Sequence, residues 1–231
     1  MKFLISIIIP VYNEESTIEK ILDKVLEQKE YEKEIIIIDD CSTDKTKALI
    51  KNKYSEKVAL ICNTQNHGKG FCIRRGIQIA KGEVILIQDA DLEYDPTDYK
   101  KILTPLINNK ADVVYGSRFL GGGGAHRVIY FWNRIANALL TFFANILIDM
   151  NLTDMETGYK AFKRDAVKDI DIKENGFGFE PEITIKLAKK KLRFYEVGVS
   201  YNGRTYQEGK KIGFKDGIWA FYCLVKYRFF K

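Results

Sequence analysis

The chain of 231 residues is long enough to build one sizeable hydrophobic core or at most two small ones. Hydrophobic residues make up 46% and charged residues 29%, which excludes disorder, collagen and coiled coil as the overall class. The net charge of +6 is concentrated in residues 186–231, where twelve Lys or Arg stand against three Asp or Glu, so we expect an anionic partner (nucleic acid, phosphorylated substrate or anionic membrane) or a solvated basic surface.

Apolar runs typical of buried strands alternate along the first half of the chain with amphipathic segments typical of helices. The runs predict strands over residues 4–9, 34–39, 58–62, 83–89 and 112–117. The amphipathic segments predict helices over residues 15–28, from 42–44 onward, over a stretch ending near 82, and from 95–96 onward. This alternation indicates an α/β fold with a mostly parallel central sheet covered by helices on both faces.

Polar residues gather directly after the apolar runs. Because parallel α/β sheets bind ligands beyond the carboxyl ends of their strands, we expect the site at residues 10–14, 39–44, 63–70 and 89–93. Residues 121–124 are all glycine and predict a mobile loop. The four cysteines form no C-x-x-C pair, so we expect neither a zinc site nor a disulfide framework, and a reducing compartment fits best.

Asp89 and Asp91 stand two residues apart at the end of a predicted strand. Side chains at this spacing point to the same side, and carboxylate oxygens are the ligands that Mg²⁺ and Mn²⁺ take together with substrate phosphates. Glu93 continues the series. The three acids predict a divalent-metal site, although a cluster that caps the helix starting near Asp95 is the simpler alternative.

Asp39 and Asp40 form a second acidic pair, where carboxylates accept hydrogen bonds from a nucleotide's base or ribose. Helix capping explains the acids and hydroxyls that follow at 42–44, but not this pair. The Gly-flanked segment 66–70 places Lys69 to face phosphate. The sequence contains neither the Walker A spacing nor a G-x-G-x-x-G turn after its first strand, which argues against nucleotide hydrolases and dinucleotide oxidoreductases.

In this order the motifs resemble family 2 glycosyltransferases, which have the GT-A fold. The resemblance rests on PVYNE (10–14), IDDCSTD (38–44), NHGKG (66–70), DADLEYDP (89–96) and GSRF (116–119). The later segments DMETGYKAF (154–162), FEPEIT (179–184) and SYNGRTYQEGKKI (200–212) resemble the branch containing dolichyl- and polyprenyl-phosphate sugar transferases. The resemblance covers nearly the whole chain, and the ordered set is far more specific than any one motif.

The resemblance implies roles for individual residues. It assigns Mg²⁺ or Mn²⁺ to Asp89 and Asp91, joined by Glu93, where family members often carry Gln. It also implies that Asp91 and Arg118 lie at the reacting centre, with Arg118 on phosphate. The implied donor-nucleotide set is Pro10, Tyr12, Glu14, Asp39, Asp40, Lys69, Asp89 and Ala90.

Two kinds of acceptor fit the chemistry of sugar transfer. A hydroxyl acceptor needs a general base, and Asp154 is the candidate; the alternative is a structural Asp that caps a turn or holds an Arg. A lipid phosphate is already anionic and needs cations instead. The candidate acceptor-binding residues are Arg127, Arg134, Glu180, Glu182, Arg204, Lys210 and Lys211.

Two segments predict attachment to a membrane surface. Within residues 128–148, polar residues recur every fourth position and leave the rest of a helix apolar; they are Asn133, Asn137, Thr141 and Asn145. Residues 218–231 interleave aromatic and basic side chains. The charge-free stretch 135–148 is shorter than the roughly 20 residues of a membrane span, and no export signal is expected at the N-terminus. Burial in a core or an oligomer interface is the alternative, and an aromatic, basic tail also suits single-stranded nucleic acid.

The sequence therefore predicts a metal-dependent enzyme that transfers a sugar from a UDP- or GDP-sugar to polyprenyl phosphate while peripherally attached at the cytoplasmic membrane face, with inversion implied by the resemblance. Residues 1–120 are expected to bind the nucleotide-sugar and residues 121–231 the acceptor and membrane, as halves of one domain. The alternatives are transfer to a sugar hydroxyl with Asp154 as base, and a non-catalytic nucleotide- or RNA-binding module. The acidic clusters argue against nucleic acid, and a homo-oligomer stays open.

Overall fold

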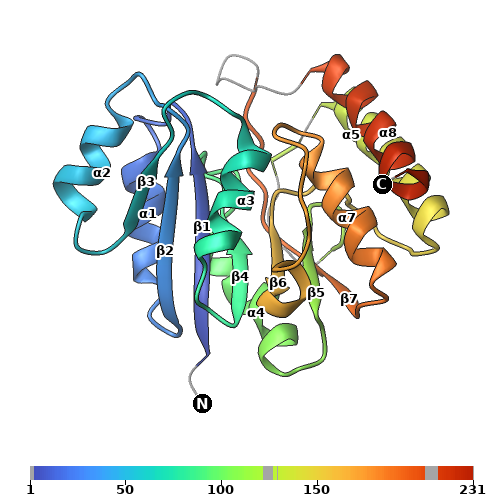
Figure 1. Ribbon diagram of the computed structural model, residues 1–231, viewed down its shortest axis with the longest axis horizontal. Helices are drawn as coiled ribbons and strands as arrows, with labels where there is room; N and C mark the ends of the chain where they lie inside the picture. Colours follow the sequence, from blue (N-terminus) through green and yellow to red (C-terminus); the bar gives the residue numbers. More distant parts are fainter. Residues whose placement is uncertain (1–2, 122–126, 129, 206–212, 231) are drawn as a thin grey trace.

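Seven strands form one mixed sheet in the computed structural model, which describes residues 3–121, 127–128, 130–205 and 213–230. The sheet order is β3-β2-β1-β4-β6-β5-β7, and among these strands only β6 runs antiparallel to its neighbours. The strands are β1 (Leu4–Val11), β2 (Glu32–Asp39), β3 (Ala59–Cys62), β4 (Val84–Ile87), β5 (Val113–Ser117), β6 (Lys160–Lys163) and β7 (Phe194–Gly198). The predicted α/β fold with a mostly parallel sheet is confirmed (Figure 1).

Helices cover both faces of this sheet because alternate strand residues point to opposite sides. Ile7 of β1 packs in a cluster with the helices α1 (Ile18–Glu27), α2 (Thr46–Tyr54) and α4 (Tyr99–Ile107), the last preceded by a short 3-10 turn, η1 (Pro96–Asp98). Ile8, the next residue, packs in a second cluster with α3 (Lys69–Ile79), α6 (Arg164–Val167) and α7 (Phe179–Lys189).

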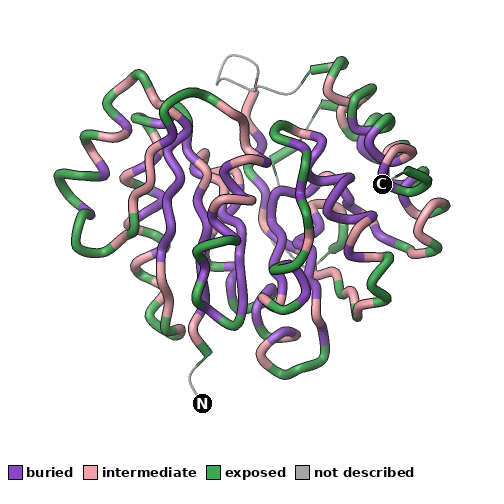
Figure 2. Tube along the Cα trace, viewed as in Figure 1, coloured by how far each residue is buried: buried purple, intermediate pink, exposed green. Residues whose placement is uncertain are grey.

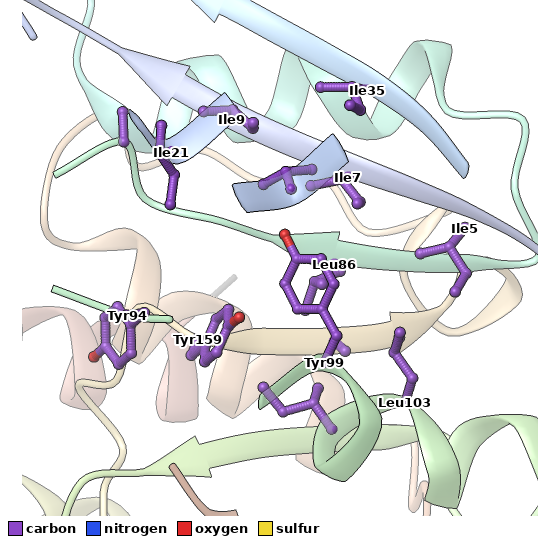
Figure 3. Packing of buried hydrophobic residues seen from close by; sticks show 14 of the residues in the cluster. Ile5, Ile7, Ile9, Ile21, Ile35, Leu86, Tyr94, Tyr99, Leu103 and Tyr159 are labelled. Atoms are coloured by element: carbon purple, nitrogen blue, oxygen red, sulfur yellow. The ribbon is translucent and has the colours of Figure 1, made fainter. Parts of the chain in front are cut away.

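The main core lies between β1, β4 and the first set of helices. Figure 3 shows Ile5, Ile7 and Ile9 of β1 close to Leu86 of β4, with aromatic rings such as Tyr99 closing the cluster. Figure 2 shows the burial along the chain: the strands are buried, whereas the outer faces of the helices are exposed. The Ile-rich runs that predicted buried strands therefore fill the centre of the molecule.

Two helices, α5 (Phe131–Ile148) and α8 (Phe214–Phe229), pack on α7 and on each other (Figure 1). They share a small third core with α7, in which Ala144, Ile185 and Leu224 meet. The two helices thus lie outside α7, at one end of the sheet.

Most predicted element ends differ from the structure by a few residues. The helix predicted to end near Gly82 ends at Ile79, and the next residue, Ala80, has an extended backbone. Gly82 itself lies so close to β1 that a Cβ there would be 2.6 Å from the Leu4 carbonyl oxygen. Of the predicted mobile loop 121–124, residues 122–124 lie outside the described residues. The sheet contains strands from both of the predicted halves, since β4 pairs with β6.

Glu174 fastens α8 to the rest of the molecule. Its carboxylate accepts hydrogen bonds from Trp219 Nε1 at 2.9 Å, Lys226 Nζ at 2.9 Å and Tyr227 Oη at 2.6 Å. Burial disfavours the charged carboxylate, but these three donors outweigh burial and lower the pKa of Glu174. One buried acid therefore holds three residues of α8.

Replacing that acid should loosen α8 alone. Glu174→Gln removes the charge that three donors share, so amide hydrogen exchange in residues 214–229 should become at least about tenfold faster while β1–β4 stay protected. The exposed Glu56→Gln variant is the control and should leave exchange unchanged. Uniform loss of protection across the sheet would show that Glu174 supports the whole fold instead.

Candidate active site

The predicted site residues meet at the carboxyl ends of β1 and β4, where the strand order changes direction. A cavity of about 910 Å³ opens there. Its polar wall includes Tyr12, Glu14, Asp40, Lys69, Asp89, Asp91, Glu93, Arg118, Glu156, Glu180 and Arg204, and the predicted Pro10 and Ala90 also line the cavity. Its apolar wall comes from α5 and α8, including Trp132, Leu139, Leu140, Phe143, Ile218 and Phe221.

Lys69 joins two acids in the polar wall. Its Nζ lies 2.8 Å from Asp89 Oδ1 and 3.3 Å from Glu180 Oε1. Burial disfavours the ammonium, but Asp89 and Glu180 outweigh burial and raise the pKa of Lys69. Lys69 therefore stays charged and holds the loop after β4 against the start of α7.

Arg204 forms the corresponding ion pair with Asp91, the second acid of the Asp89 and Asp91 pair. Its Nη2 lies 2.8 Å from Asp91 Oδ2, and its other nitrogens lie 3.6 Å from Glu14 and 3.7 Å from Glu93. Burial and repulsion from Asp89 and Glu93 raise the pKa of Asp91 to about 7, although Arg204 works against this rise. The acidic wall thus depends on a cation from the far end of the sequence.

Glu93, predicted to be a metal ligand, accepts hydrogen bonds from neighbouring protein groups. Its two oxygens accept hydrogen bonds from Tyr201 Oη at 2.9 Å and from the Arg204 backbone N–H at 2.7 Å. In the described part of the chain no three His, Cys, Asp or Glu side chains are arranged to hold a metal ion. Glu93 lines the cavity with Asp89 and Asp91, but its hydrogen bonds join it to Tyr201 and Arg204, and its role as a metal ligand stays a prediction.

The remaining pair, Asp89 and Asp91, still fits a divalent cation. Mg²⁺ is commonly bound by one or two carboxylates together with substrate phosphates and water, so it does not need an all-protein cage. Both carboxylates line the cavity, and each is held by a side-chain cation that a metal could displace.

Arg118 and Asp154 form a buried ion pair. Arg118 Nε and Nη2 each donate to one Asp154 oxygen at 2.6 Å, and Asn137 Nδ2 adds a bond at 3.3 Å. Burial disfavours the guanidinium, but Asp154 outweighs burial and raises the pKa of Arg118. Asp154 is 0% exposed and does not line the cavity, whereas Arg118 does. This geometry suits the alternative predicted for Asp154, a partner that positions Arg118, rather than a general base.

The two acids of the second cluster, Asp39 and Asp40, differ in position: Asp40 lines the cavity and Asp39 does not. Asp40 lines the cavity and accepts hydrogen bonds from Asn63 Nδ2 at 2.6 Å and from the backbone N–H groups of His67 and Gly68. Asp39 is buried behind it, with Oδ1 3.4 Å from the backbone nitrogen of Ser42. Asp40 thus shapes the loop before α3, and a base-binding role for Asp39 stays a prediction.

The predicted acceptor residues do not all reach the cavity. Glu180 and Arg204 line it. Glu182 is 0% exposed and accepts from the backbone N–H groups of residues 173 and 174, so it caps that loop instead. Arg134 is exposed and lies over the Phe119 ring at 3.9 Å, and Arg127 is exposed outside the cavity lining. Lys210 and Lys211 lie outside the described residues.

Comparison with known proteins identifies the family. The model of "Glycosyl transferase family 2" matches residues 6–171. The chain belongs to glycosyltransferase family 2. It is 30% identical over 217 residues to the dolichol-phosphate mannosyltransferase of Pyrococcus furiosus, covering 90% of this chain and 60% of that one. It is 29% identical over 215 residues to the dolichyl-phosphate beta-glucosyltransferase ALG5D of Trichomonas vaginalis, covering 86% and 65%. The chain thus spans less than two thirds of either relative.

A solved structure confirms the GT-A-like fold predicted for this family 2 glycosyltransferase chain. The structure is that of glucosyl-3-phosphoglycerate synthase from Mycobacterium tuberculosis in complex with Mn²⁺, uridine diphosphate and phosphoglyceric acid. It superposes with a TM-score of 0.76 at 17% sequence identity, covering 99% of this chain and 80% of that one. At this identity the likeness establishes the fold alone.

Two site residues were not singled out from the sequence, although both lie in the motif DMETGYKAF. Glu156 lines the cavity, and its pKa is raised to about 8 by burial and by the nearby Glu180 carboxylate. Gly158 lies against Asp89, so a Cβ there would be 2.2 Å from Asp89 Oδ2 and 3.2 Å from Lys69 Nζ. Only the packing of β6 beside β4 brings these residues to the acidic edge.

A methyl group at Gly158 should therefore damage the site more than the fold. In Gly158→Ala the Asp89 carboxylate must move away, so we expect binding of a nucleoside diphosphate with Mn²⁺ to weaken by more than about tenfold. The melting temperature should change by only a few degrees. Isothermal titration and a thermal melt measure the two effects. Full affinity in the variant would show that the observed position of Asp89 is not needed.

Proposed function

We propose that this glycosyltransferase moves a sugar from a nucleoside-diphosphate sugar to a polyprenyl phosphate with the help of Mg²⁺ or Mn²⁺. One observation carries the proposal: a single cavity joins the acids and cations at the sheet edge to an apolar groove between α5 and α8. The two similar proteins, a dolichol-phosphate mannosyltransferase and a dolichyl-phosphate beta-glucosyltransferase, support the same acceptor class.

The polar half of the cavity suits the donor. A bound divalent metal would neutralise charge on the diphosphate leaving group, and Asp89 and Asp91 are the residues that would hold it. Lys69, Arg118 and Arg204 surround the same place and supply further positive charge. The solved relative was crystallised with Mn²⁺ and uridine diphosphate, in line with this assignment. Whether the base is uracil or guanine is left to experiment.

The apolar half suits an isoprenoid chain with an anionic head. Leu139, Leu140 and Phe143 of α5 and Phe221 of α8 line the groove, and Arg118 lies between the groove and the acids as a cation for the phosphate. A phosphate acceptor carries its own nucleophilic oxygen and needs no general base. The burial of Asp154 under Arg118 therefore favours this acceptor over a sugar hydroxyl.

The outer faces of α5 and α8 suit a membrane surface. The polar stripe of α5 points inward, where Asn137 and Thr141 are buried, so its apolar side is the exposed one. Trp132 is 76% exposed on α5, and Phe229 and Phe230 are each 66% exposed at the end of α8. The basic charge of this region favours anionic lipids. A membrane beside the groove would deliver the lipid directly.

The manner of attachment follows from the packing of α5. By length and composition, α5 is the one helix in the described residues that could cross a membrane. It has 18 residues and is longer than the charge-free stretch 135–148, because it begins at Phe131. Its contacts with α7 and α8 favour a position along the surface instead. The four cysteines are unpaired, which suits the cytoplasmic face that we propose.

The metal assignment predicts a specific loss. Asp91→Asn keeps the shape of the side chain but removes one ligand charge, so the part of nucleotide affinity that depends on Mn²⁺ or Mg²⁺ should disappear. Titration of UDP and GDP with and without metal measures this part. Asp165→Asn, an exposed acid on α6, is the control. Equal metal dependence in the Asp91 variant and in wild type would refute the assignment.

The membrane assignment predicts a surface-specific effect. Wild type should float with anionic liposomes at low salt and be released at high salt, since screening weakens attraction between exposed charges. Phe142→Ser should reduce flotation several-fold, because this ring of α5 is 57% exposed outside the cavity lining and would no longer enter the interface. Tyr195→Ser removes an aromatic residue 44% exposed on β7 and should have no effect. Equal loss in the two variants would contradict the proposed face.

A further inference from the structure

The cavity contains groups whose hydrogen-bonding capacity is unused. Among the described residues, four buried side-chain atoms have no hydrogen-bond partner: Asn133 Nδ2, Glu156 Oε1, Glu180 Oε2 and Arg204 Nε. All four residues line this one cavity. Because buried polar atoms in folded proteins are nearly always paired, this concentration indicates that a ligand supplies the missing partners.

The four atoms divide by chemistry into two kinds. Asn133 and Arg204 offer N–H donors, which suit phosphate oxygens. Glu156 and Glu180 offer acceptor oxygens, which suit hydroxyl groups. No phosphate oxygen can donate to the Glu180 carboxylate, so this residue requires a different part of the ligand from the two N–H donors. A sugar hydroxyl suits both glutamates, because it can donate to the Glu180 carboxylate and can also pair with a protonated Glu156 carboxyl group.

The position of Glu180 places the two glutamates in the part of the cavity proposed to bind the nucleotide-sugar. Its Oε1 lies 3.3 Å from Lys69 Nζ, and the same nitrogen lies 2.8 Å from Asp89 Oδ1. One lysine thus separates the glutamate from the acid that would hold the metal and the diphosphate. In a nucleotide-sugar the sugar ring is bonded to that diphosphate, so its hydroxyl groups are the nearest donors.

Glu156 lines the same cavity as Glu180, and each residue has one buried carboxyl oxygen without a hydrogen-bond partner. The buried Lys160 Nζ donates to the Met155 carbonyl oxygen at 2.8 Å and to that of Thr157, so the carbonyl groups on both sides of Glu156 are fixed. Burial, together with repulsion from Glu180, raises the pKa of Glu156. The pair is therefore a preorganised patch of oxygen atoms.

We propose that Glu156 and Glu180 bind the hydroxyl groups of the donor sugar and select an uncharged hexose. This inference rests on the proposed function. A hexuronate would add a carboxylate near Glu180 and would offer one hydroxyl donor fewer, so it should bind less well than the matching hexose. Glu180, predicted from the sequence to bind the acceptor, is reassigned to the donor.

The test compares ligands with and without the sugar. Isothermal titration in the presence of Mn²⁺ would measure UDP, UDP-glucose and UDP-glucuronate, and GDP, GDP-mannose and GDP-mannuronate, on the full chain. Glu180→Gln should leave the Kd of the free nucleoside diphosphate within about twofold and weaken the hexose-linked nucleotide by about tenfold. Glu156→Gln should cause a smaller loss, because Gln resembles the protonated carboxyl. The exposed Glu56→Gln variant is the control.

Wild type should also bind each hexose-linked nucleotide with a lower Kd than the matching hexuronate-linked nucleotide. Glu180→Gln should reduce the ratio of the two Kd values. Equal loss of affinity for free and sugar-linked nucleotide would overturn the inference, since the glutamates would then act on the diphosphate. An increase in KM for polyprenyl phosphate alone would also overturn it, while leaving the proposed function standing. Failure of wild type to bind any nucleotide-sugar would instead overturn the proposed function.

Discussion

The acidic residues at the sheet edge repel one another, and the arrangement of the site depends on the cations set between them. Asp89, Asp91 and Glu14 face one cavity, and two unit charges about 4 Å apart interact by about 4 kcal/mol at an effective dielectric constant of 20. Lys69 comes from the start of α3 and Arg204 from beyond β7, so the balance of charge joins distant parts of the sequence. The same positive groups lie where a diphosphate would bring negative charge, so the fold places the cations that such a ligand needs.

The second constraint acts on α5, whose polar residues point inward. Asn137 bonds to Asp154, Thr141 Oγ1 accepts from the Met155 backbone N–H at 3.1 Å, and Asn145 bonds to the backbone of Leu152. These bonds join the polar side of the helix to residues 152–155, the segment in which Asp154 holds Arg118. The apolar side is left outward, beside the groove. One set of contacts, between α5 and residues 152–155, therefore both positions Arg118 through Asp154 and leaves the apolar face of α5 exposed.

Much of this could be predicted from the sequence, because local patterns determine it. Ile-rich runs followed by acids placed Asp89 and Asp91 at strand ends, and the period-four polar residues defined one side of α5. The direction in which that side faces could not be predicted, since it depends on Asp154 and Leu152, which are distant until the chain folds. The antiparallel β6 was missed for the same reason, and with it Glu156 and Gly158. Glu93 and Glu182 looked like site ligands, but the fold brings other hydrogen-bond donors to their oxygens: the Tyr201 hydroxyl and the Arg204 backbone N–H to Glu93, and two backbone N–H groups to Glu182.

A lipid phosphate acceptor can be distinguished from a hydroxyl acceptor in a single transfer assay. Nucleotide-sugars labelled in the sugar are incubated with Mn²⁺, the full chain and either a polyprenyl phosphate or the polyprenol of the same length, and the organic phase is counted. We expect label in the organic phase with the phosphate and none above background with the alcohol, because the cavity supplies cations and no exposed base at Asp154. Equal transfer to the alcohol, or transfer to soluble sugars alone, would contradict this expectation.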